Sequence, residues 1–364
     1  MTRKQHAWGV VALALASSAA SAQLTNFSPK ASFGSNGWLP SVASSTILDQ
    51  GNLTRGMDYN PVSGNLIVVN RQGGVNINVL DGNTGAFVRT LNNTGITGGT
   101  FAANMAAVDA GGRVFIGNLA LSGGNFKMYS FANDATADAA TTVFDGTATI
   151  RTGDTLAIRG SGETVELVAG QNGGNGFTYY TSNGLGGLNG SVVNPTGAPN
   201  NINRLGIAFG PADIVLGRDG NNPGGAAVLG VSTVAGTYSN GSNLADGNER
   251  LIDFATVGGF NLLATVQTDG GDNRNNVKIY DATDLNNLVL LGTQNLVGAG
   301  LANGNGVGAI SWGAVSGNTA TLYAMNTNNG IQAFDVEVVP EPASMAALAL
   351  GLGALAARRR RKTA

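Results

Sequence analysis

Apolar residues recur along the chain in short runs separated by turn residues, and the same unit returns six times. Each unit has a short apolar strand, a turn rich in Gly, Asn, Asp or Pro, and a second, more apolar strand. The first copy has strands at 56–59 and 66–69. The first strands of the six copies are centred on Met57, Ala106, Ala157, Gly206, Ile252 and Ala309. The spacings between these residues are 49, 51, 49, 46 and 57, close to the blade length of a β-propeller.

Further strands follow the repeated unit in several copies. In the first copy, a strand at 76–80 leads through the turn 81–85 to a strand at 87–91, and the Asp-Gly step is typical of a hairpin turn. Each copy therefore predicts a four-stranded antiparallel meander. We predict an all-β fold, a β-propeller of about six four-stranded blades, with seven blades as the alternative count. A pair of β-sandwiches and a β-helix are the rival architectures.

The last copy lacks a fourth strand, and a segment near the N-terminus could supply it. Residues 25–48 precede the first copy and contain strand-like pieces. A strand from the opposite end of the chain would complete the last blade and remove an open sheet edge. We therefore expect the ring to be closed by residues from this segment.

The N-terminus has the features of a secretory signal. Arg3 and Lys4 precede an apolar run at 7–16 and a stretch of small residues. Ala20-Ser21-Ala22 fits the A-x-A cleavage rule, which would leave Gln23 as the first mature residue. The alternative is a transmembrane anchor, although the run is short for one.

The C-terminus combines three features in a fixed order. Pro340, Glu341 and Pro342 precede an apolar run at 343–357, which predicts a short membrane helix. A basic cluster follows: Arg358, Arg359, Arg360, Arg361 and Lys362. Clustered Lys and Arg stay on the cytoplasmic side of a membrane. The alternative to a processed signal is a plain tail anchor.

These C-terminal features resemble the PEP-CTERM sorting signal of Gram-negative bacteria. The resemblance implies export, transient anchoring in the inner membrane, and processing at the Pro-Glu-Pro tripeptide by an exosortase. It also implies a final place at the cell surface or in the extracellular matrix, with a link to exopolysaccharide and biofilm. The expected domains are a signal peptide at 1–22, a propeller-like repeat domain at 23–338, which is similar to uncharacterised exported propellers, and the sorting signal at 339–364.

Composition narrows the chemistry of the repeat domain. The chain has no Cys, and its single His, His6, lies in the predicted signal. Catalysis by a thiol, by a Ser-His-Asp triad or by a His-ligated metal is therefore excluded for the mature chain. After both ends are removed, 13 basic and 21 acidic residues remain, a net charge of −8. This acidity argues against nucleic acid as a partner.

The strongest cation candidate is a loop near the fifth copy. Asp269, Asp272 and Asn273 are closely spaced oxygen donors, which Ca²⁺ prefers, but the loop lacks the closing Glu of an EF-hand. The alternative is an Asn- and Gly-rich hairpin loop without a metal, and we expect no other cofactor. Asp219 begins a weaker stretch of the same kind.

Three aspartates occupy similar places in the repeat. Asp58, Asp109 and Asp253 could form an acidic ring if the first strands line a central channel. The alternative is that each carboxylate accepts hydrogen bonds from turn amides.

Four aromatic residues could stack on sugars, namely Trp38, Tyr179, Tyr180 and Trp312. The alternative is that they belong to the core, because aromatics make up only 6% of the chain.

Two functional hypotheses follow from these observations. The first is an exported, non-enzymatic propeller that binds a partner such as extracellular polysaccharide, with exosortase and signal peptidase acting on it during export. The alternative is an extracellular hydrolase or lyase for glycans, in which paired carboxylates, with or without Ca²⁺, perform acid-base chemistry.

Overall fold

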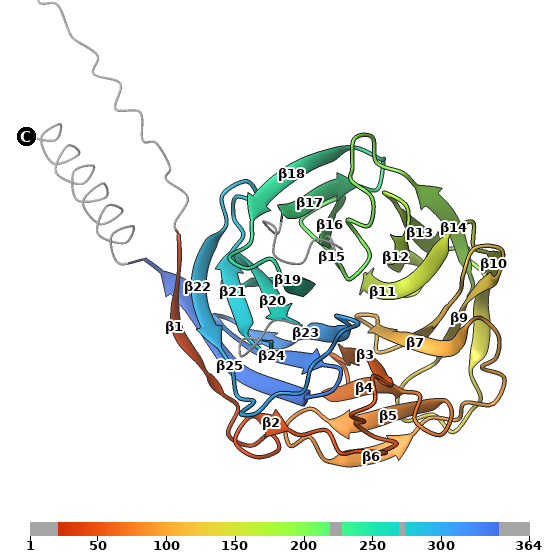
Figure 1. The fold of residues 1–364 in the computed structure, drawn as a ribbon, viewed down its shortest axis with the longest axis horizontal. Helices are drawn as coiled ribbons and strands as arrows, with labels where there is room; N and C mark the ends of the chain where they lie inside the picture. Colours follow the sequence, from red (N-terminus) through yellow and green to blue (C-terminus); the bar gives the residue numbers. More distant parts are fainter. Residues whose placement is uncertain (1–20, 219–227, 269–273, 342–364) are drawn as a thin grey trace, which may run out of the picture. The chain divides into compact units, whose positions relative to one another are not determined.

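The computed structural model describes residues 21–218, 228–268 and 274–341. Within these residues the fold is all-β, with one short 3₁₀ turn, η1 (Gly162–Thr164). Residues 23–339 form one compact unit. Its strands form six blades around a central axis, which confirms the predicted propeller and the lower of the two blade counts (Figure 1).

Blades 1 to 5 are four-stranded antiparallel meanders, in which each strand pairs with the next along the chain. The strands of blades 1 to 3 are β3 (Thr54–Tyr59), β4 (Asn65–Asn70), β5 (Asn76–Asp81), β6 (Phe87–Thr90), β7 (Phe101–Val108), β8 (Val114–Leu119), β9 (Asn125–Phe131), β10 (Thr141–Thr147), β11 (Arg151–Arg159), β12 (Glu166–Asn172), β13 (Phe177–Ser182) and β14 (Leu188–Val193). Those of blades 4 and 5 are β15 (Gly206–Phe209), β16 (Ile214–Arg218), β17 (Val228–Thr233), β18 (Tyr238–Asn243), β19 (Glu249–Val257), β20 (Phe260–Gln267), β21 (Val277–Asp281) and β22 (Val289–Gln294).

Blade 6 closes the ring with strands from both ends of the repeat domain. It contains β23 (Gly308–Ser316), β24 (Thr319–Asn326) and β25 (Gly330–Pro340), and its outer strand is β1 (Ala22–Pro29). A short strand, β2 (Trp38–Leu39), also pairs with β25 through Trp38 opposite Gln332. The prediction that the N-terminal segment supplies the missing strand is therefore confirmed, with the strand beginning three residues earlier than expected.

Burial follows the position of each strand within its blade. The second strands are almost wholly buried because neighbouring blades cover both of their faces, and β4 presents Leu66 to Val69 with no exposed surface. Interblade cores fill these spaces; one of them joins Ile67 and Val79 of blade 1 to Ile116 and Tyr129 of blade 2. The outer strand β6 is exposed throughout.

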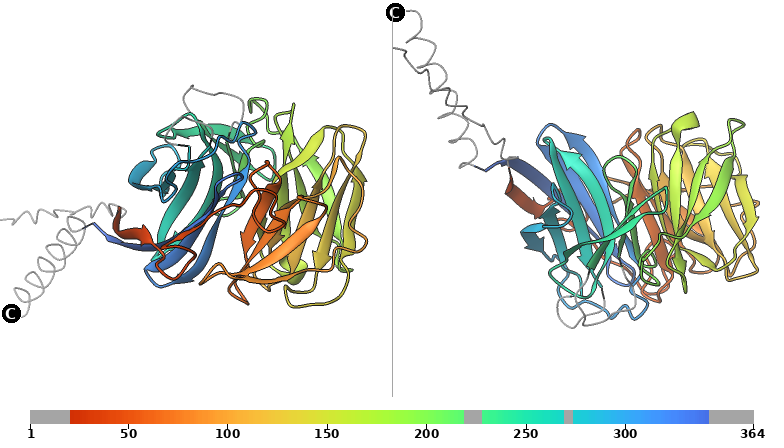
Figure 2. Two further views of the ribbon diagram at one scale, coloured as in Figure 1. Left: turned by 60° about the horizontal axis from the view of Figure 1, so that its bottom comes forward. Right: turned by 90° about the horizontal axis from the view of Figure 1, so that it is seen from above.

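Each inner strand contacts the inner strands of the two neighbouring blades, so β3, β7, β11, β15, β19 and β23 form a closed ring (Figures 1 and 2). Glycine permits this approach at defined points. A Cβ at Gly56 would lie 2.5 Å from the backbone nitrogen of Ala106 in the next blade. A Cβ at Gly206 would lie 2.1 Å from the carbonyl oxygen of Arg250. Part of the glycine content of the chain is thus required by the packing of the ring.

Candidate functional site

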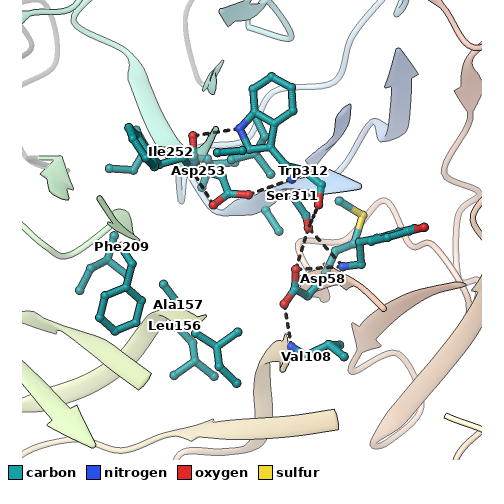
Figure 3. A pocket seen from close by; sticks show the side chains of 18 of the residues that line it. Asp58, Val108, Leu156, Ala157, Phe209, Ile252, Asp253, Ser311 and Trp312 are labelled. Carbon is teal, nitrogen blue, oxygen red and sulfur yellow. Dashed lines mark hydrogen bonds between the residues drawn. The ribbon is translucent and has the colours of Figure 1, made fainter. Parts of the chain in front are cut away.

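The six inner strands surround a cavity of about 450 Å³ on the propeller axis. Every blade contributes lining residues, and the cavity wall is made by residues of all six inner strands (Figure 3). Because the wall comes from six different segments of the chain, only the closed ring assembles it.

The cavity has a floor of hydrophobic side chains. Met105 of blade 2, Leu205 before blade 4 and Val307 before blade 6 are buried in one cluster, with Leu156 packed against it. Side chains from alternate blades meet only across the axis, so this cluster separates the cavity from the face where the inner strands begin. The candidate site is therefore a blind pocket.

One side of the pocket is polar, and Asp58 is its centre. The Asp58 carboxylate accepts hydrogen bonds from the Val108 N–H at 2.7 Å, the Tyr59 N–H at 2.9 Å and the Ser311 hydroxyl at 2.6 Å (Figure 3). These donors belong to blades 2, 1 and 6. One side chain thus ties three blades together at the channel wall.

Asp253 makes a similar contact between blades 5 and 6. Its carboxylate accepts hydrogen bonds from the Trp312 N–H and from the Phe254 N–H, both at 2.8 Å. The consecutive residues Ser311 and Trp312 therefore bind the two aspartates, one each (Figure 3).

Burial changes the ionisation of both carboxyls. It raises the pKa of Asp58 to about 6, against the opposing effect of its three hydrogen bonds. Burial, and secondarily the charge of Asp58, raises the pKa of Asp253 to about 7. Asp253 therefore holds a proton more tightly than Asp58 does, and both carboxyls hold one more tightly than an exposed aspartate. The two groups form a coupled pair.

The opposite side of the pocket is apolar and carries Leu156, Ala157 and Phe209 (Figure 3). At its edge, the guanidinium of Arg159 lies 4.4 Å from the centre of the Phe209 ring. Arg159 also forms an ion pair with Glu166. The pocket therefore offers hydrogen-bonding groups on one wall and a hydrophobic surface on the other.

The structure brings two of the three sequence-predicted aspartates into the pocket. Asp109 lies outside it and accepts hydrogen bonds from the Gly111 and Arg113 amides at 2.8 and 2.9 Å. The acidic-ring hypothesis is therefore wrong for Asp109, and the alternative holds there, because this side chain accepts from the amides of the tight turn that follows β7.

The aromatic candidates have separate positions. Trp312 lines the pocket. Trp38 donates its indole N–H to the Asn329 carbonyl at 2.8 Å, between blade 6 and its closing segment. Tyr180 is buried in the core between blades 2 and 3, and Tyr179 binds Glu166. Only Trp312 of the four is placed to contact a ligand in the pocket.

Several predicted site residues lie outside the described ranges: Asp219, Asp269, Asp272, Asn273, Ala20, Pro342, Arg358, Arg359, Arg360 and Arg361, together with the predicted C-terminal helix. Ala22 and Gln23 begin β1, and Pro340 ends β25 immediately before Glu341. Among the residues with described positions, no helix is long and apolar enough to cross a membrane. The same residues contain no group of three Asp, Glu, His or Cys that could hold a metal ion.

Sequence reasoning did not single out Ser311. It is the third residue of the sixth copy, 309–312, and Asp58 and Asp253 are the third residues of the first and fifth copies. The corresponding residues of copies two to four are Ala107, Ala157 and Ile207. An alignment of the copies would therefore have indicated a polar position in three consecutive blades.

Comparison with known proteins identifies the C-terminus. Residues 338–361 match the PEP-CTERM protein-sorting motif. The motif implies an exported protein that is anchored in a membrane and then processed by an exosortase. No curated protein matches the sequence.

The fold has a counterpart among solved structures. It is similar to the crystal structure of a DUF4623 family protein from Bacteroides eggerthii DSM 20697, with a TM-score of 0.64 and 17% sequence identity. The match covers 83% of this chain and 73% of that chain. At this identity the likeness shows the fold alone.

Proposed function

We propose that this exported propeller is a non-enzymatic binding protein of the cell surface or extracellular matrix. The observation that carries the proposal is the state of the two pocket carboxylates. Asp58 and Asp253 each accept a backbone N–H from the next blade, so their oxygens hold the wall of the channel together. The lack of Cys and of a mature His adds support.

The ligand class that fits the pocket best is the end of a neutral polysaccharide. Ser311 and the aspartates present acceptors for sugar hydroxyls, and Phe209 and Leu156 present a hydrophobic surface for the face of a sugar ring. The blind floor suits a chain end. The negative charge of the body disfavours an acidic segment at this position.

The test is binding of the processed, exported protein to neutral oligosaccharides and to polysaccharide from the producing cells, measured by calorimetry. Ala157→Trp would fill the apolar side of the pocket and should weaken binding at least about tenfold. Ala132→Trp, at an exposed position in blade 2, is the matched control and should bind as the wild type does. Absence of binding, or equal binding by Ala157→Trp, would refute the proposal.

The final location is tested by the intact mass of the protein from exterior and membrane fractions. We expect the exterior form to begin at Gln23 and to end near Pro340–Pro342, in keeping with a Gram-negative exporter. A mass that retains Arg358 to Ala364, confined to the membrane, would contradict processing and favour a plain tail anchor.

A carboxylate-dependent glycan hydrolase or lyase is the second candidate, and the raised pKa values of Asp58 and Asp253 favour it. A protonated and an ionised carboxyl in one pocket are the groups that glycosidic bond cleavage uses. The test is release of reducing ends from the bound polysaccharide. Turnover that is lost in Asp253→Asn would support the enzyme, and binding without turnover would exclude it for that polysaccharide. A dependence of turnover on Ca²⁺ would decide whether the cation takes part.

A further inference from the structure

Two arginines lie together at the end of the ring opposite to the pocket. Arg55 is in β3, and Arg71 directly follows β4. The Arg55 Nε and the Arg71 Nη1 both point to the Asn104 side-chain oxygen, at 3.4 and 3.3 Å. The Arg55 Nη1 and the Arg71 Nη2 both point to the Asn52 carbonyl, each at 3.4 Å. Two guanidiniums thus share two neutral oxygens at the long limit of hydrogen bonding.

The charge of this cluster is not balanced by its own carboxylate. Asp154 is the acidic group that acts on both arginines. It already binds Arg151 through both oxygens, at 2.8 and 2.5 Å. Three guanidiniums therefore depend on the charge of one carboxylate, although the repeat domain as a whole is negative. Like charges at this density favour an additional anion.

Two of the three arginines, Arg71 and Arg151, reach the surface, whereas Arg55 is buried. Arg71 is half-buried, and its guanidinium carbon lies 3.6 Å from the centre of the Phe101 ring, which is 39% exposed. The adjoining residues Gly73 and Gly74 are exposed. The Arg71 Nε is buried and has no hydrogen-bond partner among the described residues. One guanidinium donor of the cluster thus has no acceptor among the described residues.

We propose that Arg55, Arg71 and Arg151 form a binding site for a tetrahedral oxyanion of the phosphate or sulfate type. Guanidinium groups bind such oxyanions through paired, charge-assisted hydrogen bonds. Asn52 and Asn104 hold the two forks of Arg55 and Arg71 in place, and Asp154 holds Arg151. The site is separate from the pocket, because Arg55 lies three residues before Asp58, about 10 Å along the strand, beyond the hydrophobic floor.

The ionisation of Arg71 agrees with this assignment. Burial, and then the charge of Arg55, lowers the pKa of Arg71 to about 9. This value is still well above neutral pH, so both guanidiniums remain charged when the anion binds. A bound anion would relieve the repulsion between them.

The experiment follows the thermal midpoint of the processed, exported protein while inorganic phosphate replaces chloride at constant ionic strength. The wild type should show a midpoint that rises with phosphate and saturates. Arg71→Gln should weaken phosphate binding at least about tenfold, and Arg71→Lys should lie between them. The matched control is Arg89→Gln, at an exposed arginine of β6, which should respond as the wild type does.

A purely structural role for Arg71 predicts that Arg71→Gln lowers the thermal midpoint in chloride alone. Under the proposal, Arg71→Gln in chloride alone should have a midpoint no lower than that of the wild type, because it removes one of two repelling charges. The proposal is overturned if phosphate shifts the wild type and Arg71→Gln equally, or if phosphate and chloride act alike on the wild type. A titration of the thermal midpoint with sulfate in place of phosphate then shows whether the site prefers one of these tetrahedral oxyanions.

Discussion

Each end of β3 contributes one member of a like-charged pair, and the two pairs respond differently to the repulsion between their members. Asp58 and Asp253 face the pocket, and burial raises both of their pKa values. Arg55 and Arg71 lie at the other end, where burial lowers both of theirs. A carboxyl can take up a proton near neutral pH and lose its charge. A guanidinium cannot lose its proton there, so its pair depends on neutral acceptors and on the charge of Asp154.

This difference assigns a separate role to each end of the ring. The carboxyl pair can change its charge with pH while its hydrogen bonds to the blades persist. The arginine pair keeps its charge and is therefore suited to a solute that brings an opposite charge. The comparison can be tested by removing one member of each region and by following the dependence on pH and on phosphate.

The largest expected effect comes from removing the Asp58 side chain. Asp58→Ala leaves the Val108 and Tyr59 amides and the Ser311 hydroxyl without their acceptor. The hydrogen bonds that join blades 1, 2 and 6 at this point are then lost. We expect the free energy of unfolding to fall by about 4 kcal/mol at pH 5. Denaturant titration measures this loss.

Asp58→Asn is the matched variant, because its amide oxygen can still accept hydrogen bonds from the neighbouring strands. It should lose less than half as much stability as Asp58→Ala. Equal losses in the two variants would show that the contact needs the second carboxyl oxygen, which accepts from the Val108 N–H and which the amide of Asn replaces with a donor.

The second-largest effect is the pH dependence that Asp253 gives to the free energy of unfolding. Its pKa rises from 3.8 in the unfolded chain to about 7 in the fold, so the native state holds the proton more tightly. The stabilisation is complete below about pH 4 and is lost as the pH rises through about 7. Between pH 4 and pH 8, the wild type should lose on the order of 3 kcal/mol relative to Asp253→Asn.

The measurement is the difference between the two unfolding free energies at each pH, which cancels the contributions of other groups. A difference that stays constant, or that grows in favour of the wild type with rising pH, would contradict a raised pKa. In Asp58→Asn the transition should move to lower pH, because the charge of Asp58 contributes to the shift at Asp253.

The architecture could be predicted from the sequence because it depends on local patterns. Strand alternation, turn residues and a repeat near 50 residues lie within short windows, and they predicted the blades and the N-terminal closing strand correctly. The inner-strand positions of Asp58 and Asp253 followed from the same register. The exception, Asp109, falls one residue beyond β7, where the turn geometry decides its contacts.

The contacts that define both charged regions could not be predicted in this way. Asp58 binds Val108, 50 residues away, and Ser311, 253 residues away. Arg55 in β3 and Arg71 after β4 meet through the Asn52 carbonyl and through Asn104 of the next blade. Such contacts depend on how blades pack against each other, and a single sequence carries no local signal for that packing.

The smallest expected effect tests the arginine end of the comparison. Asp154→Asn removes the one carboxylate that faces Arg151 and that acts on Arg55 and Arg71. Three guanidiniums would then lie together without a compensating charge, and the free energy of unfolding should fall by about 2 kcal/mol in chloride buffer. Phosphate should restore part of this loss, because a bound oxyanion supplies the missing negative charge. Asp145→Asn, in the exposed pair with Lys127, is the control and should leave the stability close to that of the wild type, without a phosphate effect. If phosphate fails to stabilise Asp154→Asn more than Asp145→Asn, the arginines are held by their neutral acceptors alone, and the contrast with the carboxyl pair disappears.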